Sequence, residues 1–195
     1  MTQRLLDPRM FDTSQALGAH DGSALTSLPA TWNLISKQDF SAVASIEWTG
    51  LTSYEMYHMI GTARHSSAGS KLQILMSNDN GSTYLTTGSY QQHAVGINRT
   101  GTTTNSAGAN VNEGTLHSSG EGGSTYNTGF HAIITNTTAT SGSAQVMFVS
   151  AGNIIGQAGS FVVPNVGPND FDAFRLGVSA GNFTGTAALY GAVSV

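Results

Sequence analysis

The fold is decided by the stretch KLQILMSNDNGSTYLTTG, residues 71–88. Apolar side chains stand at every second position of its first half, at Leu72, Ile74 and Met76. That spacing is the period of a half-buried β-strand. The pair Asn80-Gly81 comes next, and these residue types tolerate the positive φ angles that a tight hairpin turn requires. Because Tyr84 and Thr86 then resume the extended pattern, the stretch predicts a β-hairpin with a polar tip near the middle of an antiparallel sheet.

Strand patterns fill most of the chain from residue 31 onward, separated by turns rich in Gly, Asn and Ser. Outside the hairpin, we expect strands that open at Trp32 and continue over residues 42–48, 54–60, 130–135, 144–150, 159–163, 171–179 and 184–193. Residues 61–70 are expected to form a loop, and the polar stretch 91–129 only short strands near 94–97 and 111–116. Short strands at this spacing, without an amphipathic helix pattern, are typical of a sandwich or barrel. We predict an all-β fold, an antiparallel sandwich or barrel domain over residues 31–195.

The first thirty residues differ from the rest. Pro8 disfavours helix at Asp7, and Gly18, Gly22 and Pro29 interrupt the remainder of the segment. We interpret residues 1–30 as an extended N-terminal docking arm, because its apolar side chains would serve no purpose in a free tail; a floppy terminus is the alternative. The candidate docking residues are Arg4, Leu5, Leu6, Met10 and Phe11.

Composition narrows the class of protein. A chain of 195 residues is long enough for one domain with a sizeable core. Only 9% of its residues are charged, against a typical value of about 25%, which suits a β-rich surface or a stable assembly. The net charge of −4 and the scattered Lys and Arg argue against nucleic-acid binding. Cysteine is absent, which excludes disulfides and thiolate metal sites. Because no apolar run approaches the roughly 20 residues of a membrane helix, membrane insertion is not expected. Met1 to Met10 lacks the apolar core of a signal peptide.

No pattern of catalytic or metal-binding residues is visible. The histidines at 58, 65, 93, 117 and 131 share no spacing that would place two metal ligands together. Asn78–Gly81 resembles part of a calcium loop but lacks the alternating oxygen donors and the distal glutamate. The nucleophile motif Gly-x-Ser-x-Gly is missing, and no motif pairs two of the eleven acidic residues. We therefore predict no catalytic residue, no metal and no cofactor.

Aromatic and histidine side chains in or beside the long polar stretch suggest carbohydrate recognition, in which rings stack on sugar faces. The candidate receptor-facing loop residues are Tyr90, His93, Tyr126 and His131. Packing at the edge of a sandwich is the alternative explanation for the same residues.

Several stretches together resemble bacteriophage virion structural proteins of the tail-fibre and receptor-binding type. The matching segments are Ala44–Tyr57, a strand, turn and Tyr segment; Ser77–Tyr84, continued by Gly88–Tyr90; Phe174–Leu176; and Phe183–Gly191. They cover turns and core positions over roughly residues 42–193. The resemblance implies a jelly-roll-like β-sandwich on a virion, commonly a homotrimer, and it brings no catalytic residues. The chain lacks the repetitive shaft of a long fibre, which favours a short attached module.

The sequence thus leads to three hypotheses. The first is a non-enzymatic bacteriophage virion protein, a tail fibre or receptor-binding module attached to other virion proteins by its N-terminal arm, with a capsid decoration (head fibre) protein as the alternative location. The second is a carbohydrate-binding, lectin-like module, whose partner would be a host surface glycan. The third is a glycan hydrolase or depolymerase domain.

Overall fold

The computed structural model describes residues 32–51, 54–67, 69–86, 89–98, 100–118, 127–135, 137, 143–152, 155–163 and 171–192. The expected docking arm over residues 1–30, with its candidate residues Arg4, Leu5, Leu6, Met10 and Phe11, lies outside this described part. Within the described residues there is no helix with the length and apolarity needed to span a bilayer.

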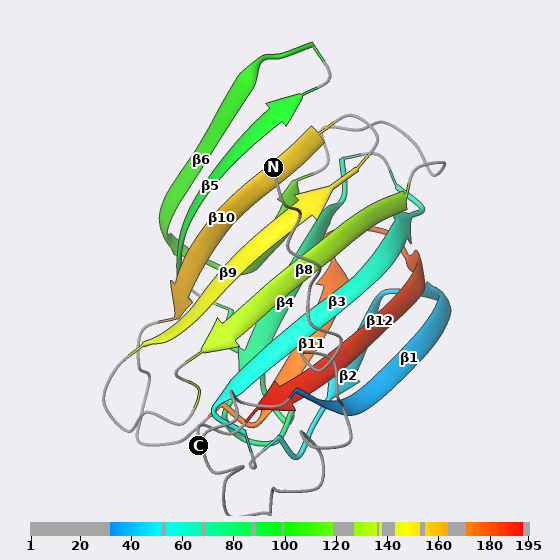
Figure 1. Ribbon diagram of the computed structural model, residues 1–195, viewed down its shortest axis with the longest axis vertical. Coiled ribbons are helices and arrows are strands. Elements are labelled where there is room, and N and C mark those ends of the chain that lie inside the picture. The colour runs from blue at the N-terminus through cyan, green and yellow to red at the C-terminus, as the bar shows by residue number, and fades with distance from the viewer. Residues whose placement is uncertain are drawn as a thin grey trace, which may run out of the picture. The chain divides into compact units, whose positions relative to one another are not determined.

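The described residues form twelve strands in two antiparallel sheets, which confirms the predicted all-β antiparallel β-sandwich. The larger sheet contains, in spatial order, β1 (Asn33–Val43), β12 (Phe183–Ala192), β3 (Met56–His65), β8 (Asn127–Thr135), β9 (Ala144–Ala151), β10 (Ile155–Val163), β5 (Tyr90–Asn98) and β6 (Thr103–Val111). The smaller sheet contains β2 (Ser45–Trp48), β11 (Ala173–Val178), β4 (Lys71–Ser77) and β7 (Gly114–Ser118). In Figure 1 the larger sheet faces the viewer, with strands of the smaller sheet behind it.

The core lies between the two sheets and results from the period of two in the strands. Along β9, AQVMFVSA, buried and exposed positions alternate without interruption. Leu72, Ile74 and Met76 of β4 are fully buried, as their spacing predicted. The largest fully buried side chains are Tyr57, Tyr90, Phe161, Phe174 and Phe183. Each buried side chain of this size contributes about 1.5–3 kcal/mol through removal of apolar surface from water.

The predicted hairpin at residues 71–88 is right in its turn and wrong in its second strand. Asn80 and Gly81 have φ angles of 57° and 82°, and the Ser82 amide donates to the Asp79 carbonyl at 3.2 Å, as a two-residue hairpin turn requires. The described residues 82–86, however, form no strand, and β4 pairs with β11 and β7 instead. Strand β11 pairs with one edge of β4 from Leu72 to Ser77, and β7 pairs with the other edge as far as Ile74. The return limb keeps one ladder-like bond, from the Leu85 amide to the Met76 carbonyl at 2.9 Å.

Other strand boundaries also differ from the prediction. The single strand expected over residues 42–48 is broken at Ala44, where the chain passes from the larger to the smaller sheet. The expected loop over residues 61–70 begins as strand, because β3 continues to His65. In the stretch 91–129 the short strand expected near 111–116 corresponds to β7, whereas β5 and β6, of nine residues each, are longer than expected, and β8 begins at Asn127. Backbone pairing to neighbours holds these strands, although their sequences carry few large apolar residues.

Candidate functional site: an open hollow on the larger sheet

The side of the larger sheet that faces away from the smaller sheet is called the outer face. The strand register arranges its side chains in cross-strand rows. One row runs through Lys37, Ala188, Ile60, His131, Val149, Ala158 and Val95. The row on one side of it runs through Leu34, Tyr190, His58, Ile133, Met147, Ser160 and His93. The row on its other side runs through Asp39, Thr186, Thr62, Gly129, Ala151, Gly156 and Ile97.

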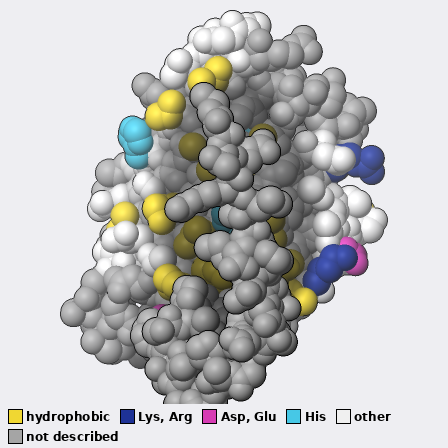
Figure 2. Space-filling model, in the orientation of Figure 1, with side chains coloured by type: hydrophobic (Ala, Val, Ile, Leu, Met, Phe, Trp, Pro, Cys, Tyr) yellow, Lys and Arg dark blue, Asp and Glu magenta, His cyan; other side chains and the backbone are white. Residues whose placement is uncertain are grey.

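This outer face is unusually apolar for an exposed surface. All the large hydrophobic side chains that are exposed among the described residues lie on this outer face, except that of Trp32, which immediately precedes β1. They are Trp32, Leu34, Ile60, Val95, Ile97, Met147 and Val149. Figure 2 looks onto this face and shows hydrophobic and histidine side chains distributed over it. The outward positions of the smaller sheet instead carry charge, such as the Arg175–Glu47 pair with a 2.7 Å contact. Large exposed apolar patches mark binding surfaces.

A hollow of about 740 Å³ opens on the outer face over β12, β3, β8 and β9. The hollow exists because small side chains meet there in adjacent strands, while larger ones stand around them. The small residues are Thr62, Gly129, Ala151, Thr186 and Ala188; the larger ones are Lys37, Ile60, His131, Val149 and Tyr190. Its volume falls within the range of about 300–1,000 Å³ that is usual for sites of small ligands.

Four rings gather at one side of this hollow, and His58 of β3 stands among them. The ring centroids of His58 and His131 are 4.2 Å apart. Trp32 meets His58 edge-on at 5.4 Å, and Tyr190 lies 5.9 Å from it. His131 and Tyr190 line the hollow directly. The result is a group of flat side chains whose faces are apolar and whose edges carry polar atoms.

The electrostatics of the hollow are close to neutral. Its one charged lining residue among those described, Lys37, pairs with Asp39 at 3.4 Å. Burial, and to a lesser degree the neighbouring His131, lowers the pKa of His58 below its ordinary value. His58 is therefore uncharged near pH 7. A site with this balance favours a neutral ligand over a strongly charged one.

The predicted receptor-facing residues have different outcomes. His131 lies in the hollow, although it stands on β8 rather than in a loop. His93 is exposed on the outer face but belongs to β5, away from the hollow. The prediction for Tyr90 is wrong: its side chain is fully buried, its hydroxyl accepts from the Met76 amide at 2.9 Å and donates to the Leu85 carbonyl at 3.2 Å. Tyr126 lies outside the described residues.

Sequence reasoning missed Trp32, His58 and Tyr190 as members of this group. No local motif joins them, since they come from the residue before β1 and from two strands that are distant in the sequence. The sequence carries only an indirect signal of this group of rings. Strands β3 and β12 place large side chains on both faces, which is unusual for a sheet with one solvated face.

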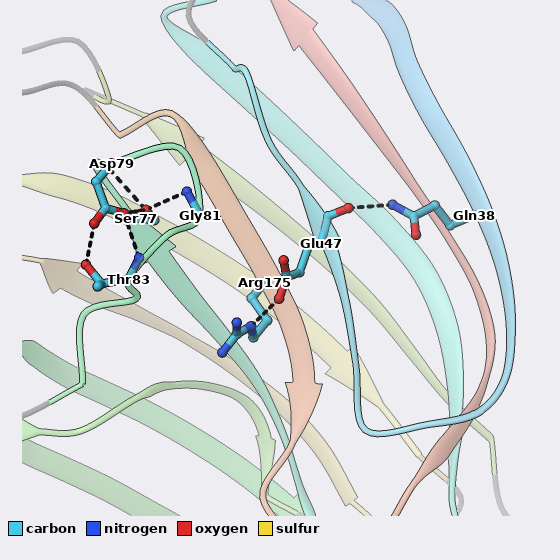
Figure 3. Close-up of polar contacts among 7 residues, drawn as sticks. All are labelled: Gln38, Glu47, Ser77, Asp79, Gly81, Thr83 and Arg175. Atoms are coloured by element: carbon cyan, nitrogen blue, oxygen red, sulfur yellow. Dashed lines mark hydrogen bonds and ion pairs between the residues drawn. The ribbon is translucent and has the colours of Figure 1, made fainter.

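The Asn78–Gly81 segment serves as a turn and not as a calcium loop. The Asp79 carboxylate accepts hydrogen bonds from the Thr83 amide at 2.8 Å, the Thr83 hydroxyl at 2.6 Å and the Ser77 hydroxyl at 2.7 Å (Figure 3). The first two of these groups, and then Ser77, lower the pKa of Asp79. Its oxygens are thus occupied by the turn itself. Across the described residues no group of three or more His, Asp or Glu side chains is placed to hold a metal ion.

Comparison with known proteins adds little. No family model and no curated protein sequence matches this chain. Among solved structures, a mutant alginate lyase Aly36B in complex with an alginate tetrasaccharide is 11% identical, covering 82% of this chain and 72% of its own, with a TM-score of 0.31. A mutant fructofuranosidase from Schwanniomyces occidentalis complexed with fructosylnystose is 7% identical, covering 86% and 35%, with a TM-score of 0.30. A protein of unknown function from Shewanella oneidensis MR-1 is 9% identical, covering 100% and 98%, with a TM-score of 0.22. TM-scores this low carry no argument about this chain.

Proposed function

We propose that this protein is a non-enzymatic recognition module of a bacteriophage virion, of tail-fibre or receptor-binding type, that binds a neutral saccharide of the host surface in the hollow of its larger sheet. The single observation that carries the saccharide part is the hollow with its group of four rings. The virion part rests on the sequence resemblance at Ala44–Tyr57, Ser77–Tyr84 and Phe183–Gly191. As part of a virion, the chain acts as a homotrimer and joins other virion proteins through residues 1–30.

A saccharide fits the hollow for chemical reasons. The apolar face of a pyranose ring can lie against the Tyr190 or His131 ring, while its hydroxyls meet hydroxyl and imidazole groups at the margins. Thr62 supplies a hydroxyl to the lining, and the Lys37 ammonium supplies a donor. The mixture of mostly apolar lining with a few polar groups is typical of sites that orient a small ligand.

Two related functions share this site or this resemblance. A stand-alone lectin-like module would use the same hollow without a virion. A capsid decoration (head fibre) protein would share the resemblance and differ in its place on the particle, which electron microscopy of intact particles distinguishes.

A glycan array tests the proposed ligand class. The Gly129→Val variant should fill the hollow from β8 with little strain, because the nearest atom to an added Cβ is the Ala151 carbonyl oxygen at 3.9 Å. Gly156→Val is the matched control, since Gly156 stands in the same row on β10 and has open space around it. We expect wild type and Gly156→Val to bind one set of neutral saccharides and Gly129→Val to lose them. Equal binding by all three proteins, or by none, would contradict the site.

Release of reducing ends from host polysaccharide by the wild-type protein would contradict the non-enzymatic function while leaving the binding site intact. The non-enzymatic function and the saccharide site can therefore be disproved independently of each other.

A further inference from the structure

The pair Asn80-Gly81 carries chemistry besides its turn geometry. Asn80 is the one asparagine in this chain that is followed by glycine. In such a pair the backbone nitrogen of the glycine can attack the side-chain amide of the asparagine, because glycine has no Cβ to hinder the approach. Asn80 is exposed, so the water that completes the reaction reaches it.

The reaction is a spontaneous deamidation. The Gly81 nitrogen bonds to Cγ of Asn80 and closes a succinimide ring, while the bond from Cγ to Nδ2 breaks and Nδ2 leaves as ammonia with the proton of the Gly81 amide. Water then adds to either carbonyl carbon of the ring and opens it. The product is an aspartate at position 80 or an isoaspartate, in which the main chain runs through the side-chain carboxyl carbon.

Two hydrogen bonds hold the reacting groups of the folded chain in other contacts. The Gly81 amide donates to Ser77 Oγ at 3.0 Å, as Figure 3 shows, and Ser77 is itself fully buried. The side-chain oxygen Oδ1 of Asn80 accepts from the Gly50 amide at 2.7 Å. The first bond holds the proton that the attacking nitrogen must lose, and the second bond holds the side chain that must rotate.

The main chain of the turn is fixed as well. The Asn80 amide donates to the Asp172 carboxylate at 2.8 Å. The groups that hold the pair therefore come from three segments that are distant in the sequence: Gly50 follows β2, Ser77 ends β4, and Asp172 precedes β11. We call the place where these residues meet Asn80 and Gly81 the turn corner.

We propose that Asn80 is a deamidation site whose rate is set by the fold. The reaction is slow while Ser77 and Gly50 hold the pair, and it is fast once the turn corner opens. An opening of this corner is thereby converted into a permanent covalent change. This inference does not depend on the virion role or on saccharide binding.

Deamidation should loosen the turn corner further. The new carboxylate at position 80 follows Asp79 directly and joins the Asp172 carboxylate, to which the amide of the same residue donates. Like charges this close repel one another. An isoaspartate also lengthens the main chain of the turn by one carbon. The deamidated protein, separated by ion exchange, should therefore melt at a lower temperature than the unmodified protein.

Peptide mass spectrometry of the full chain, incubated in mildly alkaline buffer, tests the proposal. Exchange of the amide for a carboxylate raises the mass of the peptide that contains Asn80, and chromatography separates its aspartate and isoaspartate forms. Folded wild type should form them at least about tenfold more slowly than wild type in denaturant, because the folded chain must first break both hydrogen bonds. Equal rates in the two conditions, or no modification in denaturant, would overturn the proposal.

Two variants locate the protection. Ser77→Ala removes the acceptor of the Gly81 amide. Thr83→Ala is the matched control, because it removes a hydroxyl that bonds to Asp79 in the same turn and leaves the bonds of Asn80 and Gly81 in place. Folded Ser77→Ala should deamidate about three- to tenfold faster than wild type, and Thr83→Ala at the wild-type rate.

Circular dichroism under the incubation conditions confirms that each variant is folded, and the comparison of folded with denatured wild type stands without either of them. A wild-type rate in folded Ser77→Ala, or equal acceleration by Thr83→Ala, would overturn the proposed control by the fold.

Discussion

His117 of β7 shows how one buried residue connects the two sheets. Its Nδ1 lies 3.0 Å from the Ser150 hydroxyl oxygen of β9, and that hydroxyl donates to the Leu116 carbonyl at 2.8 Å. Since the single hydroxyl proton is already used, Nδ1 must be the donor to Ser150. The neutral ring therefore carries its proton on Nδ1 and leaves Nε2 as a buried acceptor without a hydrogen-bond partner among the described residues. Protonation of Nε2 would place a charge in the core.

Acid should therefore destabilise the fold through His117. Burial, and then the nearby His65, lowers the pKa of His117 from 6.5 to about 4. Because the folded-state pKa is the lower one, the stabilising contribution is fully present above pH 6.5 and is lost as the pH falls toward 4, on the order of 3 kcal/mol in all. Thermal unfolding measured between pH 7 and pH 4.5 should show this loss.

The His117→Gln variant removes the titration and should show a flatter dependence of melting temperature on pH, at some cost in stability at pH 7. His93→Gln, at an exposed position on β5, is the control and should keep the wild-type slope. The same slope in all three proteins would rule out His117 as the source.

Two glycines in adjacent strands should respond oppositely to the same substitution. A Cβ on Gly61 of β3 would overlap the Thr186 carbonyl oxygen and lie 2.8 Å from the Phe130 ring, so Gly61→Ala should destabilise the protein by about 1–3 kcal/mol. A Cβ on Gly129 of β8 would meet only the Ala151 carbonyl oxygen, at 3.9 Å, so Gly129→Ala should be neutral or stabilising by about 0.5 kcal/mol, because glycine is costly to order in a strand. Urea unfolding gives the free energy of unfolding of both variants. Equal changes in that free energy would contradict the surroundings that the structure gives to Gly61 and Gly129.

At the scale of elements, the sequence predicts strands where apolar residues alternate. The predicted strands 130–135 and 144–150 correspond to β8 and β9, whose inward positions are buried and, apart from Thr128 and Ser150, apolar. Strand β6, TTNSAGANV, offers no such signal. An edge strand held by pairing to a single neighbour needs little apolar alternation, so its existence depends on its partner β5 and not on its own residues.

Turns show the same division between local and distant causes. Asn80-Gly81 predicts its own turn because positive φ is a local property. Which strands then lie beside β4 depends on β7 and β11, which are distant in the sequence. The hollow likewise depends on strands that are distant from one another in the sequence. It requires that Thr62, Gly129 and Ala151 fall in one cross-strand row, and no single strand sequence reveals that register.

At the scale of the whole molecule, the expected division into arm and sandwich remains a prediction with a direct test. Both sheets and the core are formed by residues between Trp32 and Ala192. A chain that lacks residues 1–30 should therefore keep its sheet signal in circular dichroism and its cooperative melting, and should no longer join virions. Incorporation of the shortened chain at the wild-type level would contradict a docking role for the N-terminal residues.

Fluorescence of Trp32 tests most directly whether the proposed saccharide binds in the hollow on the larger sheet. Trp32 is an exposed member of the ring group, whereas Trp48, the other tryptophan, is buried. Titration with a saccharide selected on the array should change the fluorescence of wild type and Gly156→Val saturably, and that of Gly129→Val and Trp32→Phe little. The same saturable change in Gly129→Val as in wild type, or no change in wild type, would contradict the account.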